Sequence, residues 1–449
     1  MLTRPDQRFQ PAQNFLYSAG RWSWLAAPVL LLYLACAANG ADETYQALIF
    51  TGTIAVLLLA CFLRPEFRKG LGRIRPHWSL LAAFGATLLV AVWSLTPWVP
   101  GGAQPVWSYT DALGAAVLDR SRAVVEVVKL LGLACIFVVG AVYGAEDRDG
   151  RRLGFALLLG GALFSLWSLS AFASGGTIFG ARLDSGLPSA NIAGTLWAVL
   201  LLLALALPSL RSRRGQSRTQ AERFIGRYAP MIALSLLFGV CLVLTASRGA
   251  MIAAVVGGAA YLGLRALAGQ LKLWELVTGV VLPGAIGLGM LLTKGAAILA
   301  RFQHFQIDAA DRQLMIGVHF KAFLVSPLMG YGLRSFDAVN KLFMTAQTYP
   351  HLWEARATHN VYVQWLEEAG LLGAAPMFLT IALIIAPCLM AVMARGKSSA
   401  LLSALLVADV VFLFHGVSDF SLEVPAIAAF WALLLGLQYG LATRRRHAR

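Results

Sequence analysis

Apolar runs of roughly 18 to 22 residues recur along the whole chain, and this pattern limits the fold more than any other feature. Each run is long enough to cross about 30 Å of hydrocarbon as a helix. Hydrophobic residues make up 58% of the chain and charged residues only 13%, which fits a chain that sits mostly in lipid. The sequence therefore predicts an all-α, polytopic transmembrane helical bundle.

We expect about twelve spans, because a helix must supply all its backbone hydrogen bonds itself within lipid. They lie near residues 22–38, 45–63, 78–96, 123–143, 153–173, 191–210, 229–246, 250–267, 274–293, 371–394, 399–417 and 424–442. The chain thus divides into residues 1–293 with nine spans, a long polar loop at 294–358, and residues 359–449 with the last three spans. A run at 313–323 within the loop predicts a short amphipathic helix.

Basic residues fall in alternate loops between these spans. They occur within residues 64–75, 148–152, 211–227, 265–272, 395–397 and 444–449. Loops rich in Lys and Arg stay on the cytoplasmic side of a membrane. We therefore expect both termini to be cytoplasmic, and the loop 294–358 to lie on the external side.

The net charge of +15 follows mostly from this topology and from contact with anionic lipids. No soluble basic domain is present that would carry a nucleic acid, so we expect no nucleic-acid partner. The five cysteines fall in or at the ends of apolar spans, outside any Cys/His spacing typical of a metal site: Cys36, Cys61, Cys135, Cys241 and Cys388. We expect no disulfide, no metal and no nucleotide cofactor.

Polar residues that could take part in a reaction are predicted to lie together on the external side. Three arginines, Arg182, Arg248 and Arg312, lie on separate external segments, against the positive-inside trend. His359 lies at the boundary between the polar loop and the tenth span, where an imidazole can titrate near neutral pH. His304, His319, His351 and His415 compete with it as a candidate base. Glu367 and Glu368 follow about two helical turns later.

Four pieces of sequence, in the family's order, resemble the O-antigen ligase and polymerase superfamily of bacterial envelope glycosyltransferases. They are Arg182 with Pro188–Asn191, Thr245–Ala250, Arg312 with Ser326–Gly332, and Thr358–Asn360 continuing to Gly373. The resemblance covers about residues 179–373. It implies a protein of the bacterial inner (cytoplasmic) membrane with a periplasmic active site and, as donor, a glycan on undecaprenyl pyrophosphate.

Ligases, repeat-unit polymerases and protein O-oligosaccharyltransferases of this superfamily share these motifs and differ in the acceptor. Oligosaccharyltransferases commonly carry a further external domain near the carboxyl end, and polymerases often have two large external loops. This sequence shows one large loop and ends soon after its last span. We therefore expect a ligase, with the lipid A-core oligosaccharide as acceptor, and keep the other two activities as alternatives.

Displacement of a lipid pyrophosphate by a sugar hydroxyl needs a base and cations that stabilise the departing charge. We assign the base to His359, and the catalytic cations to Arg182 and Arg248, because the planar guanidinium binds phosphate oxygens in pairs. We expect Arg312, Asn360 and Glu368 to bind substrate.

Two other classes of function remain possible for such a chain. A secondary transporter is also a bundle of about twelve spans, but its polar residues gather at the midplane, and its halves repeat. A structural membrane protein needs no external cluster of histidine and arginine.

The charge pattern makes a testable statement about topology. In a cysteine-free background, a membrane-impermeant thiol reagent should label Ala346→Cys in intact spheroplasts and leave Ser217→Cys unlabelled until the membrane is opened. Labelling of Ser217→Cys from outside would overturn the topology, and with it an external site.

Overall fold

The protein is described from a computed structural model, which covers residues 10–75, 77–110, 112–175, 182–205, 219–273, 305–394 and 399–444. Six helices in this part of the chain are long and apolar enough to cross a membrane. They are α2 (Thr44–Phe62), α5 (Arg120–Gly144), α6 (Asp147–Ala173), α10 (Arg248–Leu267), α15 (Val361–Met393) and α17 (Pro425–Thr443). The described chain therefore forms a multi-pass helical membrane protein.

Shorter apolar stretches occupy most of the remaining predicted spans. They lie in α1 (Gln10–Ala37), α4 (Trp78–Trp93), α7 (Ala190–Ala204), α9 (Gln220–Leu244) and α16 (Ser399–His415). The predicted ninth span, residues 274–293, lies outside the described residues, so a total of twelve spans stays a prediction. The predicted helix at 313–323 is confirmed as part of α12 (Phe305–Val325).

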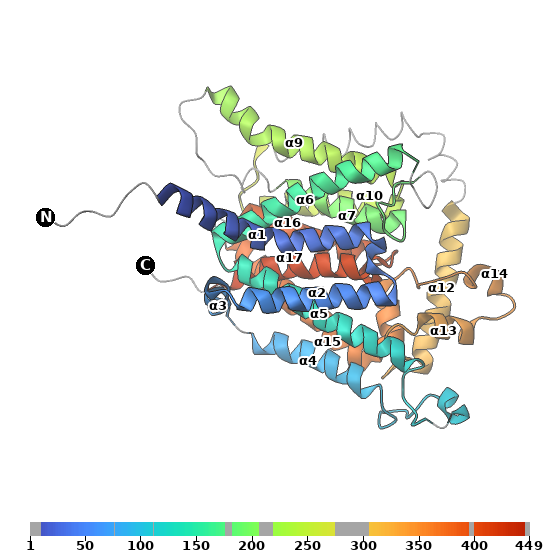
Figure 1. The fold of residues 1–449 in the computed structure, drawn as a ribbon. Coiled ribbons are helices and arrows are strands. Elements are labelled where there is room, and N and C mark those ends of the chain that lie inside the picture. Colours follow the sequence, from blue (N-terminus) through green and yellow to red (C-terminus); the bar gives the residue numbers. More distant parts are fainter. Residues whose placement is uncertain are drawn as a thin grey trace.

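The two ends of the bundle carry different segments (Figure 1). Helix α12, together with α13 (Phe336–Phe343) and α14 (Tyr349–Leu352), lies at one end, whereas α3 (Pro65–Leu71), the start of α1 and the end of α17 lie at the other. Three short 3₁₀ turns complete the described elements: η1 (Asn39–Ala41), η2 (Pro105–Tyr109) and η3 (Ser421–Glu423).

Segments that the charge pattern assigns to the cytoplasm contact one another at the end that holds α3. Arg73 pairs with Glu146 at 3.2 Å, Arg444 pairs with Asp147, and the backbone of Ile74 pairs with that of Arg444. The alternation of loops therefore agrees with the predicted topology, and the compartment that each end faces stays a prediction.

Helix α17 forms the centre of the bundle, because 89% of its apolar 18-residue stretch is buried inside the protein. It packs closely on α5 because both helices present small residues at the crossing. A side-chain carbon added at Gly436 or Gly440 would collide with the backbone of Phe137 or Ala141 on α5. Such close backbone approach is how membrane helices gain packing energy without a hydrophobic driving force.

Helix α15 begins ten residues earlier than the span predicted at 371–394, and this corrects the sequence-based boundary. Asn360 starts the helix, because its side-chain oxygen accepts the backbone N–H groups of Tyr362 and Val363, both at 3.0 Å. The sequence misplaced the start because the polar Glu367 and Glu368 and the helix-breaking Gly370 precede the long apolar run.

A loop replaces two hydrogen bonds of α15 where Gly370 interrupts it. In an unbroken helix, Leu371 and Leu372 would donate to the carbonyls of Glu367 and Glu368. Here Leu371 and Leu372 donate to Pro327 and Leu328, at 2.8 and 3.1 Å. The carbonyls of Glu367 and Glu368 accept from Tyr331 and Gly332 instead, at 3.0 and 2.8 Å.

We call this set of four bonds the α15 clasp. It requires glycine on both sides. Gly370 has φ 59° and ψ −174°, a region that only glycine adopts readily, and Gly330 has φ 68°. A side-chain carbon at Gly330 would collide with the backbone of Glu367, and one at Gly370 with that of Leu328. The clasp therefore fixes the end of α12 to the middle of α15.

We predict that Gly370→Ala destabilises the protein by at least about 1–3 kcal/mol, because alanine meets both the backbone collision and the unfavourable dihedral angles. Thermal unfolding of the detergent-solubilised protein measures the effect. Gly85→Ala is the matched control, since Gly85 lies in the apolar helix α4 and an added carbon there meets no atom within 4 Å. Equal melting temperatures for the two variants would contradict the clasp.

Candidate active site

Arg182 joins three of the segments that the sequence singled out. Its Nε donates to the carbonyl of Thr245 at 2.7 Å, and its Nη2 donates to Oδ1 of Asn191 at 2.7 Å. The next residue, Leu183, donates its N–H to Leu244 at 3.0 Å. Arg182 is thus held between the end of α9 and the start of α7.

The turn Thr245–Ala250 brings Arg248 to the same place. Ser247 caps α10 by accepting the N–H of Ala250 at 3.4 Å, and Arg248 is the first helical residue. Gly249 lies against the ring of His415 at the end of α16, since an added carbon would lie 2.7 Å from its Nε2. The start of α10 therefore touches the connection between α16 and α17.

His359 lies beside this connection from the other direction. The N–H of Val361 donates to the carbonyl of Gly416 at 2.9 Å, which fastens the start of α15 to the end of α16. The His359 ring packs edge-on against Phe420, with ring centres 4.9 Å apart. Its Nδ1 is buried and has no hydrogen-bond partner within the described residues. A buried nitrogen without a partner is unusual and marks a place where a further group can bind.

Two charges of opposite sign act on His359. Burial lowers the pKa of His359 below its usual value of 6.5, the carboxylate of Asp419 raises it, and the guanidinium of Arg312 lowers it. The net result is a neutral imidazole at neutral pH with a lone pair free to accept a proton. Among the described residues Arg312 forms no hydrogen bond or ion pair, so its charge remains available to an anion.

A buried polar network surrounds Asp419, a residue that the sequence does not single out strongly. Nδ1 of His415 lies 2.8 Å from the Thr195 hydroxyl, which lies 2.7 Å from that of Ser421. The Ser421 hydroxyl donates to Oδ2 of Asp419, whose buried Oδ1 has no partner among the residues that the structure describes. In the sequence, only the polar stretch 415–423 between two apolar runs points to this network, and an ordinary loop would give the same pattern.

The structure gives Asn360 and Glu368 other partners. The Asn360 side chain caps α15, as described above. The Glu368 carboxylate accepts the N–H of Arg334 at 2.6 Å and the side-chain amide of Gln364 at 3.2 Å. The substrate-binding role of these two residues stays a prediction, and neither side chain extends the group around His359.

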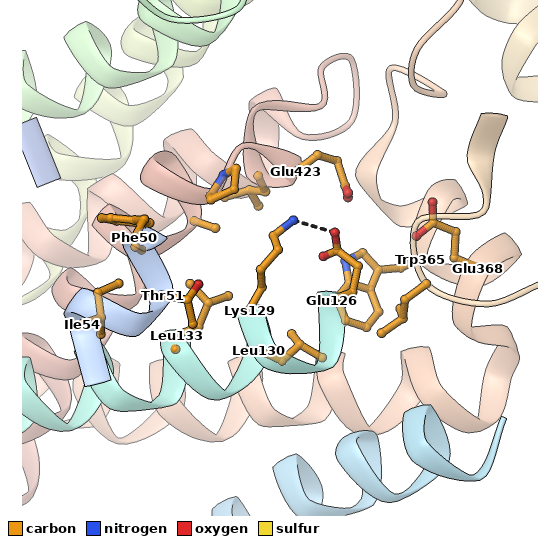
Figure 2. A pocket seen from close by; sticks show the side chains of 16 residues that line it. Phe50, Thr51, Ile54, Glu126, Lys129, Leu130, Leu133, Trp365, Glu368 and Glu423 are labelled. Atoms are coloured by element: carbon orange, nitrogen blue, oxygen red, sulfur yellow. Dashed lines mark hydrogen bonds and ion pairs between the residues drawn. The ribbon is translucent and has the colours of Figure 1, made fainter. Parts of the chain in front are cut away.

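Glu368 instead lines a separate cavity between α2, α5, α15 and α17. Figure 2 shows Glu126, Lys129 and Glu423 facing it, with Lys129 and Glu126 joined at 2.6 Å. Burial raises the pKa of Glu423, and the nearby Arg334 acts in the opposite direction. The cavity measures about 60 Å³, and a water molecule needs about 10–15 Å³ by this measure. It has room for a few waters and is too small for a sugar ring.

The fold and this group of residues define a class: a multi-pass helical membrane protein whose histidine, aspartate and arginines converge at one end of the bundle. Residues 233–378 match the family described as O-antigen ligase. This match covers about a third of the chain and supports the resemblance of its motifs to the O-antigen ligase superfamily. The match includes Arg248, Arg312 and His359. The comparison with curated proteins returns no match.

The match supports a transferase role. The family match begins in α9 and ends in α15, so Arg182 and Asp419 lie outside it. The influence of Asp419 on His359 comes from the tertiary structure alone.

The electrostatics of His359 can be measured without substrate. Arg312→Gln should raise the pKa of His359, because it removes a positive charge that opposes protonation, and Asp419→Asn should lower it for the opposite reason. Nitrogen-15 NMR of the histidine side chains measures both shifts in detergent. Arg356→Gln is the control, since Arg356 is exposed and lies three residues before His359 in the sequence. An unchanged His359 pKa in Arg312→Gln would show that the Arg312 charge does not act on the His359 ring.

Proposed function

We propose that this protein is an O-antigen ligase, which transfers a glycan from undecaprenyl pyrophosphate to the lipid A-core oligosaccharide at the periplasmic face of the inner membrane. The observation that carries the proposal is the state of His359. Within the described residues its buried Nδ1 has no hydrogen-bond partner, and the carboxylate of Asp419 and the guanidinium of Arg312 both act on the ring. This is the arrangement that a base beside an anionic leaving group requires.

In the proposed reaction, the acceptor hydroxyl oxygen attacks the anomeric carbon of the donor sugar. Nδ1 of His359 takes the hydroxyl proton as the new carbon–oxygen bond forms. The bond from the anomeric carbon to the pyrophosphate oxygen breaks, and its electron pair leaves with undecaprenyl pyrophosphate. Asp419 stabilises the imidazolium that results, since its charge favours the protonated ring. Before the reaction, burial and Arg312 keep the ring neutral.

The arginines divide the remaining work. Arg312 is partly buried and forms no hydrogen bond or ion pair within the described part of the chain, so we assign it directly to the pyrophosphate. Arg182 uses its Nε and Nη2 to join α7 and α9, and we assign it and Arg248 to shaping the donor site and supplying positive charge there. No metal or nucleotide is required in this scheme, because the energy of transfer resides in the donor's glycosyl–pyrophosphate bond.

Reconstitution tests the function directly. The purified protein is incubated with an undecaprenyl-pyrophosphate glycan and with rough lipopolysaccharide, and product masses are followed. A ligase adds the glycan to lipopolysaccharide. A polymerase lengthens the lipid-linked glycan with or without lipopolysaccharide, and that outcome would replace the proposed acceptor while keeping the donor.

We predict that His359→Ala slows glycan transfer by about 10²- to 10⁴-fold, the usual contribution of a general base, while donor binding stays near that of the unaltered protein. Rates from the same reconstituted assay, with donor affinity measured separately, check this. His351→Ala is the matched control, because His351 is an exposed histidine at the same end of the bundle. Near-normal transfer by His359→Ala would remove His359 as the base.

A further inference from the structure

A buried pair of a histidine and a glutamate has no role in the reaction proposed above. Nδ1 of His319 on α12 lies 2.5 Å from Oε2 of Glu367 on α15, and both side chains are 0% exposed. Burial lowers the pKa of His319 to about 4, which the nearby Asn340 side chain only partly offsets. The ring is therefore neutral, and the contact is a hydrogen bond rather than an ion pair.

This bond is inaccessible to substrate. The His319 ring stacks on Phe336 of α13 with ring centres 4.5 Å apart, and the Asn340 side chain acts on the same ring. Within the described residues, neither Nε2 of His319 nor Oε1 of Glu367 has a partner at hydrogen-bond geometry. Burying polar atoms costs free energy that a single hydrogen bond only partly offsets. A group with no route to the acceptor is no base, so its use lies in what it holds in place.

The spacing along both helices shows what that is. Arg312 lies seven residues before His319 on α12, which is two helical turns and about 10.5 Å on nearly the same face. Glu367 lies seven residues after Asn360 on α15, and His359 directly precedes Asn360. The buried bond therefore stands two turns from Arg312 along one helix and two turns from the base along the other.

The α15 clasp holds only the far end of α12, beyond Val325. Along the helix itself, His319–Glu367 is the side-chain hydrogen bond from α12 to α15 within the described residues. Without it, α12 can rotate or slide on α15 about the clasp, and the displacement grows toward Arg312. A misplacement of about 1 Å in an active site can cost about a hundredfold in rate.

We propose that His319 and Glu367 are positioning residues, whose buried hydrogen bond sets α12 on α15 so that the Arg312 guanidinium meets the leaving group beside His359. The inference rests on the proposed function. It assigns the pair neither contact with substrate nor proton transfer, and it makes the effect of His319 depend on Arg312.

A double-mutant cycle tests that dependence. Transfer rates are compared for His319→Leu, Arg312→Lys and the double variant in the reconstituted assay. If His319 acts through Arg312, the double variant should be within about threefold of Arg312→Lys alone, because coupled residues are not additive. His319→Leu alone should be slower by about ten- to a hundredfold, mainly in kcat. Losses that multiply in the double variant, or a normal rate for His319→Leu, would overturn the proposal.

Conservative variants and a matched control separate positioning from folding. Glu367→Gln keeps a group that can donate to or accept from His319, and should retain a rate within about threefold of the unaltered protein. Glu367→Leu removes the bond from the other side and should match His319→Leu. His351→Leu breaks the exposed 2.8 Å contact between His351 and Asp311 on the same helix and should leave the rate unchanged. Failure of both leucine variants at His319 and Glu367 to fold would assign the pair to stability alone and overturn the positioning role.

A readout without substrate keeps this inference distinct from the proposed function. If Arg312 moves away from His359 in His319→Leu, the pKa of His359 should rise, in the same direction as in Arg312→Gln. A protein that makes no product refutes the proposed function, and the titration of His359 then decides the positioning role by itself. A product-forming protein with an unchanged His359 pKa in His319→Leu overturns the positioning role alone.

Discussion

Four hydrogen bonds to the loop Pro327–Gly332 replace two helical bonds of α15 at Gly370. They determine how α12 and the loop after it are placed on α15. A break in a helix within or near a membrane leaves backbone groups that water does not satisfy. The loop supplies partners for all of them, at 2.8 to 3.1 Å. Two segments about forty residues apart in the sequence thereby become one rigid unit, and α12 with Arg312 is attached to α15 with His359.

The charges that act on His359 also come from segments far apart in the sequence. Asp419 and Arg312 act on the pKa of His359 in opposite directions, so burial decides that the ring is neutral before substrate arrives. Asp419 accepts a hydrogen bond from Ser421, which is joined through the Thr195 hydroxyl to His415, and this network connects Asp419 to α7 and α16. The acidic cavity around Glu126, Glu368 and Glu423 lies on the other side of η3 and is small.

The external arginines illustrate how much of the site the sequence could predict. Arg182, Arg248 and Arg312 stand out because they oppose the positive-inside trend, and His359 because it lies at a span boundary. Contacts between their segments follow in the structure through Thr245, Gly249 and Gly416. The sequence did not single out Asp419, and it assigned substrate binding to Glu368 without showing that Glu367 bonds His319. Neighbouring residues on a helix face different partners, and only the packing of α12 and η3 shows which partner each one has.

The length of the apolar runs by itself determined that the chain crosses a membrane as a helical bundle. The reason is that lipid offers no hydrogen-bond partners, and a helix pairs its backbone N–H and C=O groups internally. Alternating basic loops determined which segments share an end, and contacts among Arg73, Glu146 and Arg444 agree. Only the tertiary structure decided that α15 starts at Asn360, that a loop completes it at Gly370, and that Glu368 lines a cavity apart from His359. The physical reason is that these features depend on backbone and side-chain partners from distant parts of the chain, which periodicity and hydropathy along one segment do not record.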